Sequence, residues 1–156
     1  MRRKDREVTD NYEIDKIINS CQIIRLAFAD GVAPYIVPLN FGFEEKDGKR
    51  TFYFHGAKEG RKLDLIKKLG VAGFEADSDT EIYGGREACT YSSKFKSVIG
   101  YGKIEIVEDK AEKIHGLNVI MAHYVPGKSF EFSDGNVNAV EVFKLEVREI
   151  SAKLHS

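Results

Sequence analysis

Residues 23–54 read IIRLAFADGVAPYIVPLNFGFEEKDGKRTFYF. The two Asp-Gly dipeptides in this stretch, at residues 30–31 and 47–48, are typical of tight hairpin turns. Three runs rich in β-branched and aromatic residues flank the turns: residues 23–28, 35–41 and 51–54. Because short turns join consecutive strands, the stretch predicts an antiparallel meander and disfavours a parallel Rossmann-type sheet.

Three other segments carry apolar residues at helical spacing. A cap at Thr9 or Asp10 precedes the first segment, and a cap at Asp109 precedes the third. Gly70 is placed to end the second. These signals predict short helices over residues 10–21, 60–69 and 109–124.

Further strands are expected over residues 71–76, 97–107 and 140–150. A polar connection over residues 77–87 joins the first two, and a glycine- and polar-rich loop precedes the last. Gly100 and Gly102 mark bulges or close backbone approach in the longest strand. About six strands and three short helices predict a mainly β fold, an antiparallel barrel with helical decoration.

Composition narrows the class of protein. A chain of 156 residues with 42% hydrophobic residues is expected to form one domain over residues 1–156. A net charge of −1 gives no global field to attract nucleic acid or an anionic membrane surface. Cys21 and Cys89 have no metal-ligand or CxxC spacing, so no metal site is expected. With neither an export signal nor an apolar span, a cytoplasmic protein is expected.

The segment whose residues could form a binding site is 55–62, HGAKEGRK, which lies between a strand end and a helix start. Its glycines allow close approach of a ligand to the backbone, and Lys58, Arg61 and Lys62 converge near free helical N–H groups. These are the ingredients of a phosphate clamp, although a solvated, charged first helical turn would have the same residues. Residues 35–40, YIVPLN, favour the clamp because this strand has no formal charge and Pro38 lacks an N–H. Such a strand offers backbone groups to a planar ligand.

Residues 34–42 and 52–65, PYIVPLNFG and FYFHGAKEGRKLDL, resemble the pyridoxamine 5′-phosphate oxidase-related flavoproteins, in particular their nitroimidazole-resistance branch. The resemblance extends over about residues 9–150. It implies a split β-barrel and a homodimer with FMN at the subunit interface. Residues 146–156 have no counterpart of the oxidase's substrate-binding residues, so the resemblance does not extend to vitamin B6 oxidation.

The resemblance also implies roles for individual residues. The strand over residues 35–40 would line the isoalloxazine ring, largely through its main chain, and Arg61 and Lys62 would bind the FMN phosphate. Ser97 would reach the flavin, and His55 would lie beside it as the catalytic candidate. The full set of expected cofactor-binding residues is Tyr35, Ile36, Val37, Pro38, Leu39, Asn40, Phe54, His55, Gly56, Lys58, Arg61, Lys62 and Ser97.

The function expected from this reading is an FMN-dependent reductase. It would take hydride from NAD(P)H and pass electrons to a small acceptor such as a nitro-aromatic. The alternative is a non-catalytic carrier or sensor that holds flavin or haem.

Overall fold

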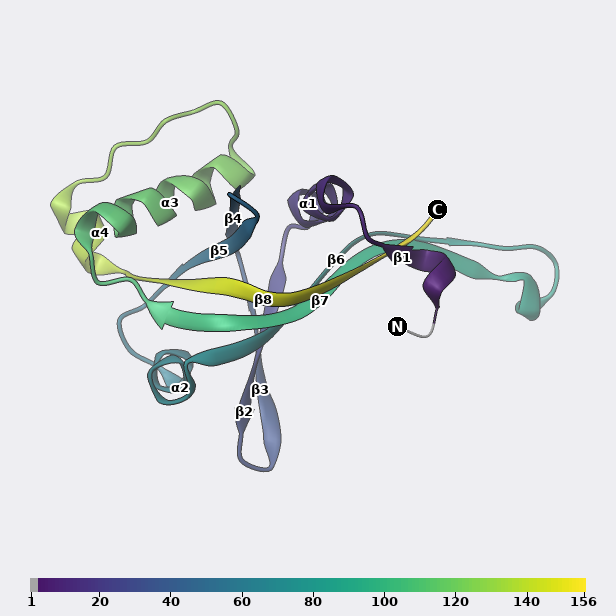
Figure 1. Ribbon diagram of the computed structural model, residues 1–156, viewed down its shortest axis with the longest axis horizontal. Helices are drawn as coiled ribbons and strands as arrows, with labels where there is room; N and C mark the ends of the chain where they lie inside the picture. The colour runs from purple at the N-terminus through teal and green to yellow at the C-terminus, as the bar shows by residue number, and fades with distance from the viewer. Residues whose placement is uncertain (1–2) are drawn as a thin grey trace.

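The computed structural model describes residues 3–156, which form an open antiparallel sheet with helices around it (Figure 1). The strand order is β3-β2-β6-β7-β8-β5-β4, with β1 paired to β8. The strands are β1 (Glu7–Val8), β2 (Ile24–Asp30), β3 (Ala33–Leu39), β4 (Gly42–Lys46), β5 (Lys49–Gly56), β6 (Val71–Tyr83), β7 (Ser92–Ile106) and β8 (Glu141–His155). The mainly β, antiparallel prediction is confirmed, and the unclosed sheet fits a split barrel.

The predicted meander is wrong, because β3 and β4 lie at opposite ends of the sheet. The turns themselves are as predicted: Gly31 has φ 67°, and Asp47 and Gly48 have φ 54° and 79°. Between the hairpins the fully buried Phe41 enters the core, and its N–H donates to the hydroxyl of Tyr124 at 3.1 Å. The chain therefore crosses the core at this point instead of turning back into a third adjacent strand.

Strands β6 and β7 are longer than expected. The predicted connection over residues 77–87 is wrong over its first part, because residues 77–83 continue β6. Cross-strand ion pairs support this arm: Lys96 lies 2.6 Å from Asp79, and Lys94 lies 3.5 Å from Glu81. Figure 1 shows the arm projecting from the body of the molecule. The residues of the arm are polar because both faces of its strands are exposed, and not because they form a loop.

The predicted role of the two glycines in β7 is confirmed. A Cβ at Gly100 would collide with the carbonyl oxygen of Glu149, and one at Gly102 would collide with that of Glu146. The pairing of β7 with β8 also shifts register between Tyr101 and Gly102. Glycine here permits the close approach and local irregularity of the two longest strands.

The three predicted helices are present, as α1 (Asn11–Ser20), α2 (Arg61–Leu69) and α3 (Lys110–Tyr124). Asp10 and Asp109 accept hydrogen bonds from Glu13 N and Glu112 N as caps. An additional helix, α4 (Asp134–Ala139), lies in the segment expected to be a loop, because Ser133 caps it and Val137 is buried. Short 3₁₀ turns span Lys4–Arg6 and Ala88–Thr90.

Most of the buried side chains form one cluster that combines α1, α2 and the inner face of the sheet. A second cluster lies under α3 and α4. Within residues 3–156, no helix is long and apolar enough to cross a membrane.

Candidate functional site

Helix α2 begins without a capping side chain. Its N-cap, Gly60, has φ 131°, a conformation that favours glycine, and makes no side-chain cap hydrogen bond. The carbonyl of Gly60 accepts from the N–H groups of Leu63 and Asp64 at 2.9 and 3.3 Å. The N–H groups of the first two helical residues have no acceptor within the helix, which makes this end suited to an anion.

Lys62 places a half-buried ammonium group beside this helix start. Its Nζ would lie 2.9 Å from a Cβ at Gly56, and it is 5.2 Å from the centre of the Phe143 ring. No carboxylate of residues 3–156 lies within 4.0 Å of it. Burial lowers the pKa of Lys62, and no neighbouring charge offsets this effect. A cation held in this way is suited to an anionic ligand.

Arg61 is held by contacts with the β2–β3 hairpin. Its Nε and Nη2 donate to the same carboxylate oxygen of Asp30, at 2.8 and 2.5 Å. Its guanidinium also lies over the Tyr35 ring, 4.7 Å from the ring centre. The structure therefore brings together the predicted residues Tyr35, Gly56, Arg61 and Lys62.

Strand β3 forms one edge of the sheet. The two-residue turn before β3 sets which residues form hydrogen bonds with β2. With this register, the main-chain N–H and C=O groups of residues 34, 36 and 38 point away from β2. Pro34 and Pro38 have no N–H, so this edge offers the N–H of Ile36 and a row of carbonyl groups. Prolines also protect an edge strand from pairing with another strand. The edge is therefore suited to a small ligand.

The side chains of residues 35–40 alternate in burial. Tyr35, Val37 and Leu39 pack against the core, whereas Ile36, Pro38 and Asn40, the residue after β3, are exposed. Only the main chain of the strand can thus present one continuous surface to a ligand.

The other predicted residues differ in position. Phe54 is buried and stacks on Phe143, with ring centres 5.2 Å apart. His55 is exposed at the end of β5, and Lys58 is exposed in the loop before α2. Ser97 lies on β7 and is not beside strand β3, because β2 and β6 separate β7 from β3.

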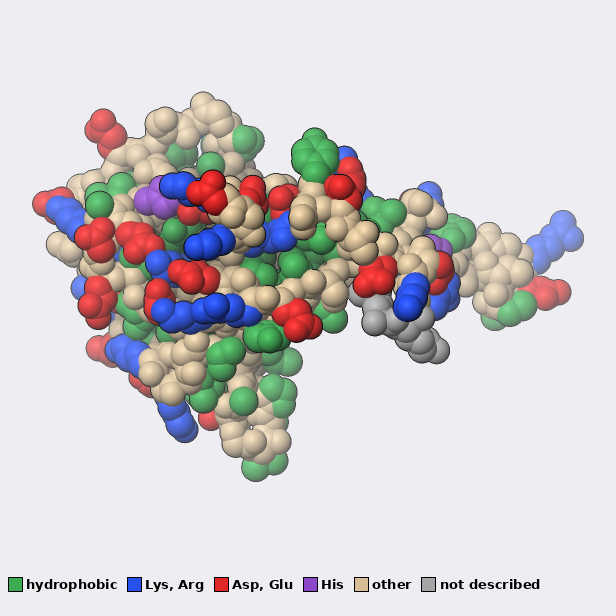
Figure 2. Space-filling model, in the orientation of Figure 1, with side chains coloured by type: hydrophobic (Ala, Val, Ile, Leu, Met, Phe, Trp, Pro, Cys, Tyr) green, Lys and Arg blue, Asp and Glu red, His purple; other side chains and the backbone are tan. Residues whose placement is uncertain are grey.

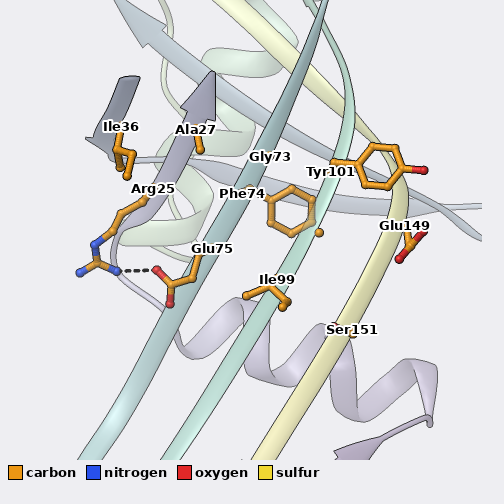
Figure 3. Close-up of a pocket in the computed structure, with 11 residues that line it drawn as sticks. Arg25, Ala27, Ile36, Gly73, Phe74, Glu75, Ile99, Tyr101, Glu149 and Ser151 are labelled. Carbon is orange, nitrogen blue, oxygen red and sulfur yellow. Dashed lines mark hydrogen bonds and ion pairs between the residues drawn. The ribbon is translucent and has the colours of Figure 1, made fainter. Parts of the chain in front are cut away.

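A separate hollow of about 540 Å³ lies on the outer face of the sheet (Figure 3). Its lining residues come from β2, β3, β6, β7 and β8: Arg25, Ala27, Ile36, Gly73, Phe74, Glu75, Ile99, Gly100, Tyr101, Glu149 and Ser151. At its rim, Arg25 pairs with Glu75 and Asp77 at 2.9 and 2.8 Å. Burial raises the pKa of Glu75, and the neighbouring Arg25 opposes this shift. Of the residues predicted to bind the cofactor, Ile36 lines this hollow.

Comparison with known proteins assigns the chain to a family. The family model described as pyridoxamine 5′-phosphate oxidase matches residues 10–154. The chain belongs to this family. Among curated proteins, no sequence matches.

Solved structures agree with this assignment. A candidate 5-nitroimidazole antibiotic resistance protein from Bacteroides thetaiotaomicron is 30% identical, with 94% of this chain and 85% of that chain covered and a TM-score of 0.81. The expected likeness to the nitroimidazole-resistance branch and the split-barrel fold are confirmed.

Two more distant structures show the shared fold. Flavocytochrome Anf3 from Azotobacter vinelandii is 19% identical over 100% of this chain and 72% of that chain, with a TM-score of 0.81. The FAD and heme binding protein from Mycobacterium smegmatis is 16% identical over 97% and 74%, also with a TM-score of 0.81. At the level of the oxidase family, the functional prediction is confirmed.

Sequence reasoning missed three features of the site of this oxidase-family chain. The sequence indicates Asp30 only as a turn residue, and its distance of 31 positions from Arg61 gives no local signal of their contact. The sequence places Phe143 in the last strand and gives no sign that its ring lies near the Lys62 ammonium. The outer hollow depends on strand order, although the exposed alternation of Ile99 and Tyr101 around Gly100 could have indicated it.

The cost of burying Lys62 gives a stability prediction. We expect Lys62→Met to raise the free energy of unfolding at neutral pH, because it keeps the side-chain packing and removes a desolvated charge. Since the folded-state pKa of Lys62 is lowered, wild-type stability should rise with pH in the alkaline range below 10.5, and the advantage of the variant should shrink there.

Urea unfolding at several pH values measures this difference. Lys67→Met, at an exposed position on the same helix, is the matched control and should show no such gain. A less stable Lys62→Met at neutral pH, with Lys67→Met unchanged, would mean that the ammonium group has a stabilising partner.

Proposed function

We propose that this protein is an FMN-dependent reductase of small acceptors such as nitro-aromatics. The observation that carries the proposal is the half-buried ammonium of Lys62, which has no carboxylate partner within residues 3–156 and lies beside the uncapped start of α2. A phosphate group would supply the missing negative charge and accept from the free N–H groups. Arg61 adds a second cation at the same helix start.

The residues fit both ends of FMN. Lys62, Arg61 and the close backbone at Gly56 would hold the phosphate, since a side chain at Gly56 would contact the Lys62 ammonium. The open edge of β3 would hold the ring system through the N–H of Ile36 and the carbonyl groups beside it. Tyr35 joins the two regions, because it belongs to β3 and stacks on Arg61.

Bound FMN would supply the redox chemistry, accepting hydride from a nicotinamide nucleotide and passing electrons to the acceptor. The protein's part is to orient the ring and to limit its contact with water. His55 is exposed at the end of β5, one residue before Gly56, so its imidazole can meet an acceptor arriving from solvent. An imidazole at this place could form a hydrogen bond with the acceptor.

A homodimer with FMN at the interface is part of the proposal. Four large apolar side chains are exposed on the outer face of the sheet: Ile36 (58%), Val71 (47%), Ile99 (51%) and Tyr101 (45%). An apolar sheet face of this kind is typical of a surface that a partner covers. Figure 2 shows hydrophobic side chains at the surface of the projecting β2–β3 hairpin as well. We also propose a cytoplasmic location, which the two free cysteines support.

The first prediction concerns the phosphate. We expect Arg61→Ala/Lys62→Ala to weaken FMN binding by at least ~100-fold, because charge-assisted hydrogen bonds contribute about 1.5–3 kcal/mol each. Riboflavin, which lacks the phosphate, should bind the variant and the wild type alike. Fluorescence titration of both flavins measures this. Equal losses for both flavins, or none for either, would mean that the two cations form only a solvated helix start.

The second prediction separates an enzyme from a carrier. NADH or NADPH should bleach the flavin absorbance of the holoprotein, and a nitro-aromatic acceptor should restore it. We expect His55→Ala to change acceptor turnover or the flavin potential without unfolding the protein, whereas His115→Ala, on α3 and paired with Glu44, should change neither. If neither nicotinamide nucleotide reduces the flavin, the result would favour a non-catalytic carrier. If the protein shows a haem spectrum, haem and not FMN is its cofactor.

The third prediction concerns assembly. A carboxylate at position 99 would be buried unpaired in the proposed interface, so Ile99→Glu should shift sedimentation from dimer to monomer and reduce flavin retention. Ile82→Glu changes an exposed isoleucine on the arm, away from this face, and should leave both properties unchanged. A wild-type protein that is strictly monomeric yet fully loaded with flavin would contradict the dimer.

A further inference from the structure

Asp30 and Arg61 come from different parts of the chain and meet in an unusual geometry. Asp30 is the last residue of β2, at the turn that leads into β3, and Arg61 is the first residue of α2. Both Nε and Nη2 of Arg61 donate to Oδ2 of Asp30. Only one edge of the planar guanidinium is used by this contact, and the edge formed by Nη1 and the second hydrogen of Nη2 is left for another acceptor.

The guanidinium has a second contact. It lies over the ring of Tyr35, with the guanidinium carbon 4.7 Å from the ring centre. The ion pair and the Tyr35 ring together limit the movement of the guanidinium group. Arg61 would otherwise be free to move, since its side chain is 62% exposed, compared with 24% for Asp30.

We propose that Asp30 is a positioning residue, which holds one edge of Arg61 so that the other edge is ready to bind a phosphate monoester. This inference rests on the proposed function, because the ligand is the FMN phosphate. Asp30 belongs to the hairpin that contains β3, so the same contact links the strand proposed to hold the ring to the helix proposed to hold the phosphate.

Asp30 has two opposite effects on phosphate binding: it positions Arg61, and its negative charge repels the phosphate. A carboxylate near the site would repel a phosphate, but a phosphate on the free edge of Arg61 would have the positive guanidinium between it and Asp30, and solvent would screen the repulsion. Ordering a long side chain before the ligand binds changes affinity by roughly three- to tenfold. We therefore expect positioning to outweigh repulsion at this exposed site.

Variants at Asp30 and Arg61 test the inference by titration with FMN and riboflavin. Asp30→Ala should weaken FMN binding roughly three- to tenfold and leave riboflavin binding unchanged. Asp30→Asn keeps an oxygen that can accept from Nε and Nη2 while removing the charge, so it should bind FMN at least as tightly as wild type. In an Arg61→Ala background, Asp30→Ala should have no further effect.

A control is Asp134→Ala, which removes an exposed carboxylate that also pairs with a cation, Lys110, at 2.7 Å. It should change neither affinity. Tighter FMN binding by both Asp30 variants would mean that Asp30 competes with the phosphate, and equal weakening of FMN and riboflavin would mean a purely structural role. Either result, or an unchanged FMN affinity in Asp30→Ala, would overturn the inference.

A measurement without flavin distinguishes failure of this inference from failure of the proposed function. In ¹⁵N NMR spectra of the free protein, the Nε–H signal of Arg61 should be retained in Asp30→Asn, lost to solvent exchange in Asp30→Ala, and shifted by inorganic phosphate. If the wild type and the two variants show this pattern but the wild type does not bind FMN, the proposed cofactor is overturned and the positioning role is supported. Wild-type protein that binds neither FMN nor phosphate would overturn both.

Discussion

Phe41 connects the two hairpins of the first half of the chain, and its burial sends them to opposite edges of the sheet. Its ring is fully buried against Phe52 and His123, with ring centres 5.7 and 4.4 Å apart, and its N–H donates to Tyr124. Since the chain must pass through the core here, β4 cannot pair with β3. The edge of β3 therefore stays open, and the candidate site depends on that open edge.

Several groups at the same site make the free energy of folding less favourable than apolar residues would. Lys62 has a charge whose desolvation lowers its pKa, and Pro34 and Pro38 remove N–H groups from an edge strand. Neither feature adds to the hydrophobic core, and each is understandable if a ligand completes it: an anion for the ammonium group and a planar molecule for the strand edge. Local cost at several neighbouring positions is what a binding site produces in an otherwise consistent fold.

Features set by neighbours in the chain could be predicted from the sequence. The caps at Asp10 and Asp109, the stop at Gly70, and the turns at Gly31 and Gly48 each depend on a few adjacent residues. Features set by distant contacts could not. The crossing at Phe41 needs a partner 83 residues away, and the arm over residues 77–83 needs the facing charges of β7.

The candidate site divides in the same way. The segment over residues 55–62 could be recognised because its cations, glycines and helix start are contiguous, whereas Asp30 reaches Arg61 only in the folded chain.

Ser97 shows more clearly what the sequence of one chain cannot predict. Three strand spacings separate β7 from β3, about 14 Å across the sheet, so one chain does not set Ser97 beside the open edge of β3. A flavin contact by both elements is more readily made between two copies, and the exposed apolar side chains of Ile99 and Tyr101 lie on the strand that contains Ser97. The separation of β7 from β3 within one chain thus fits the proposed homodimer, in which a second copy would complete the site.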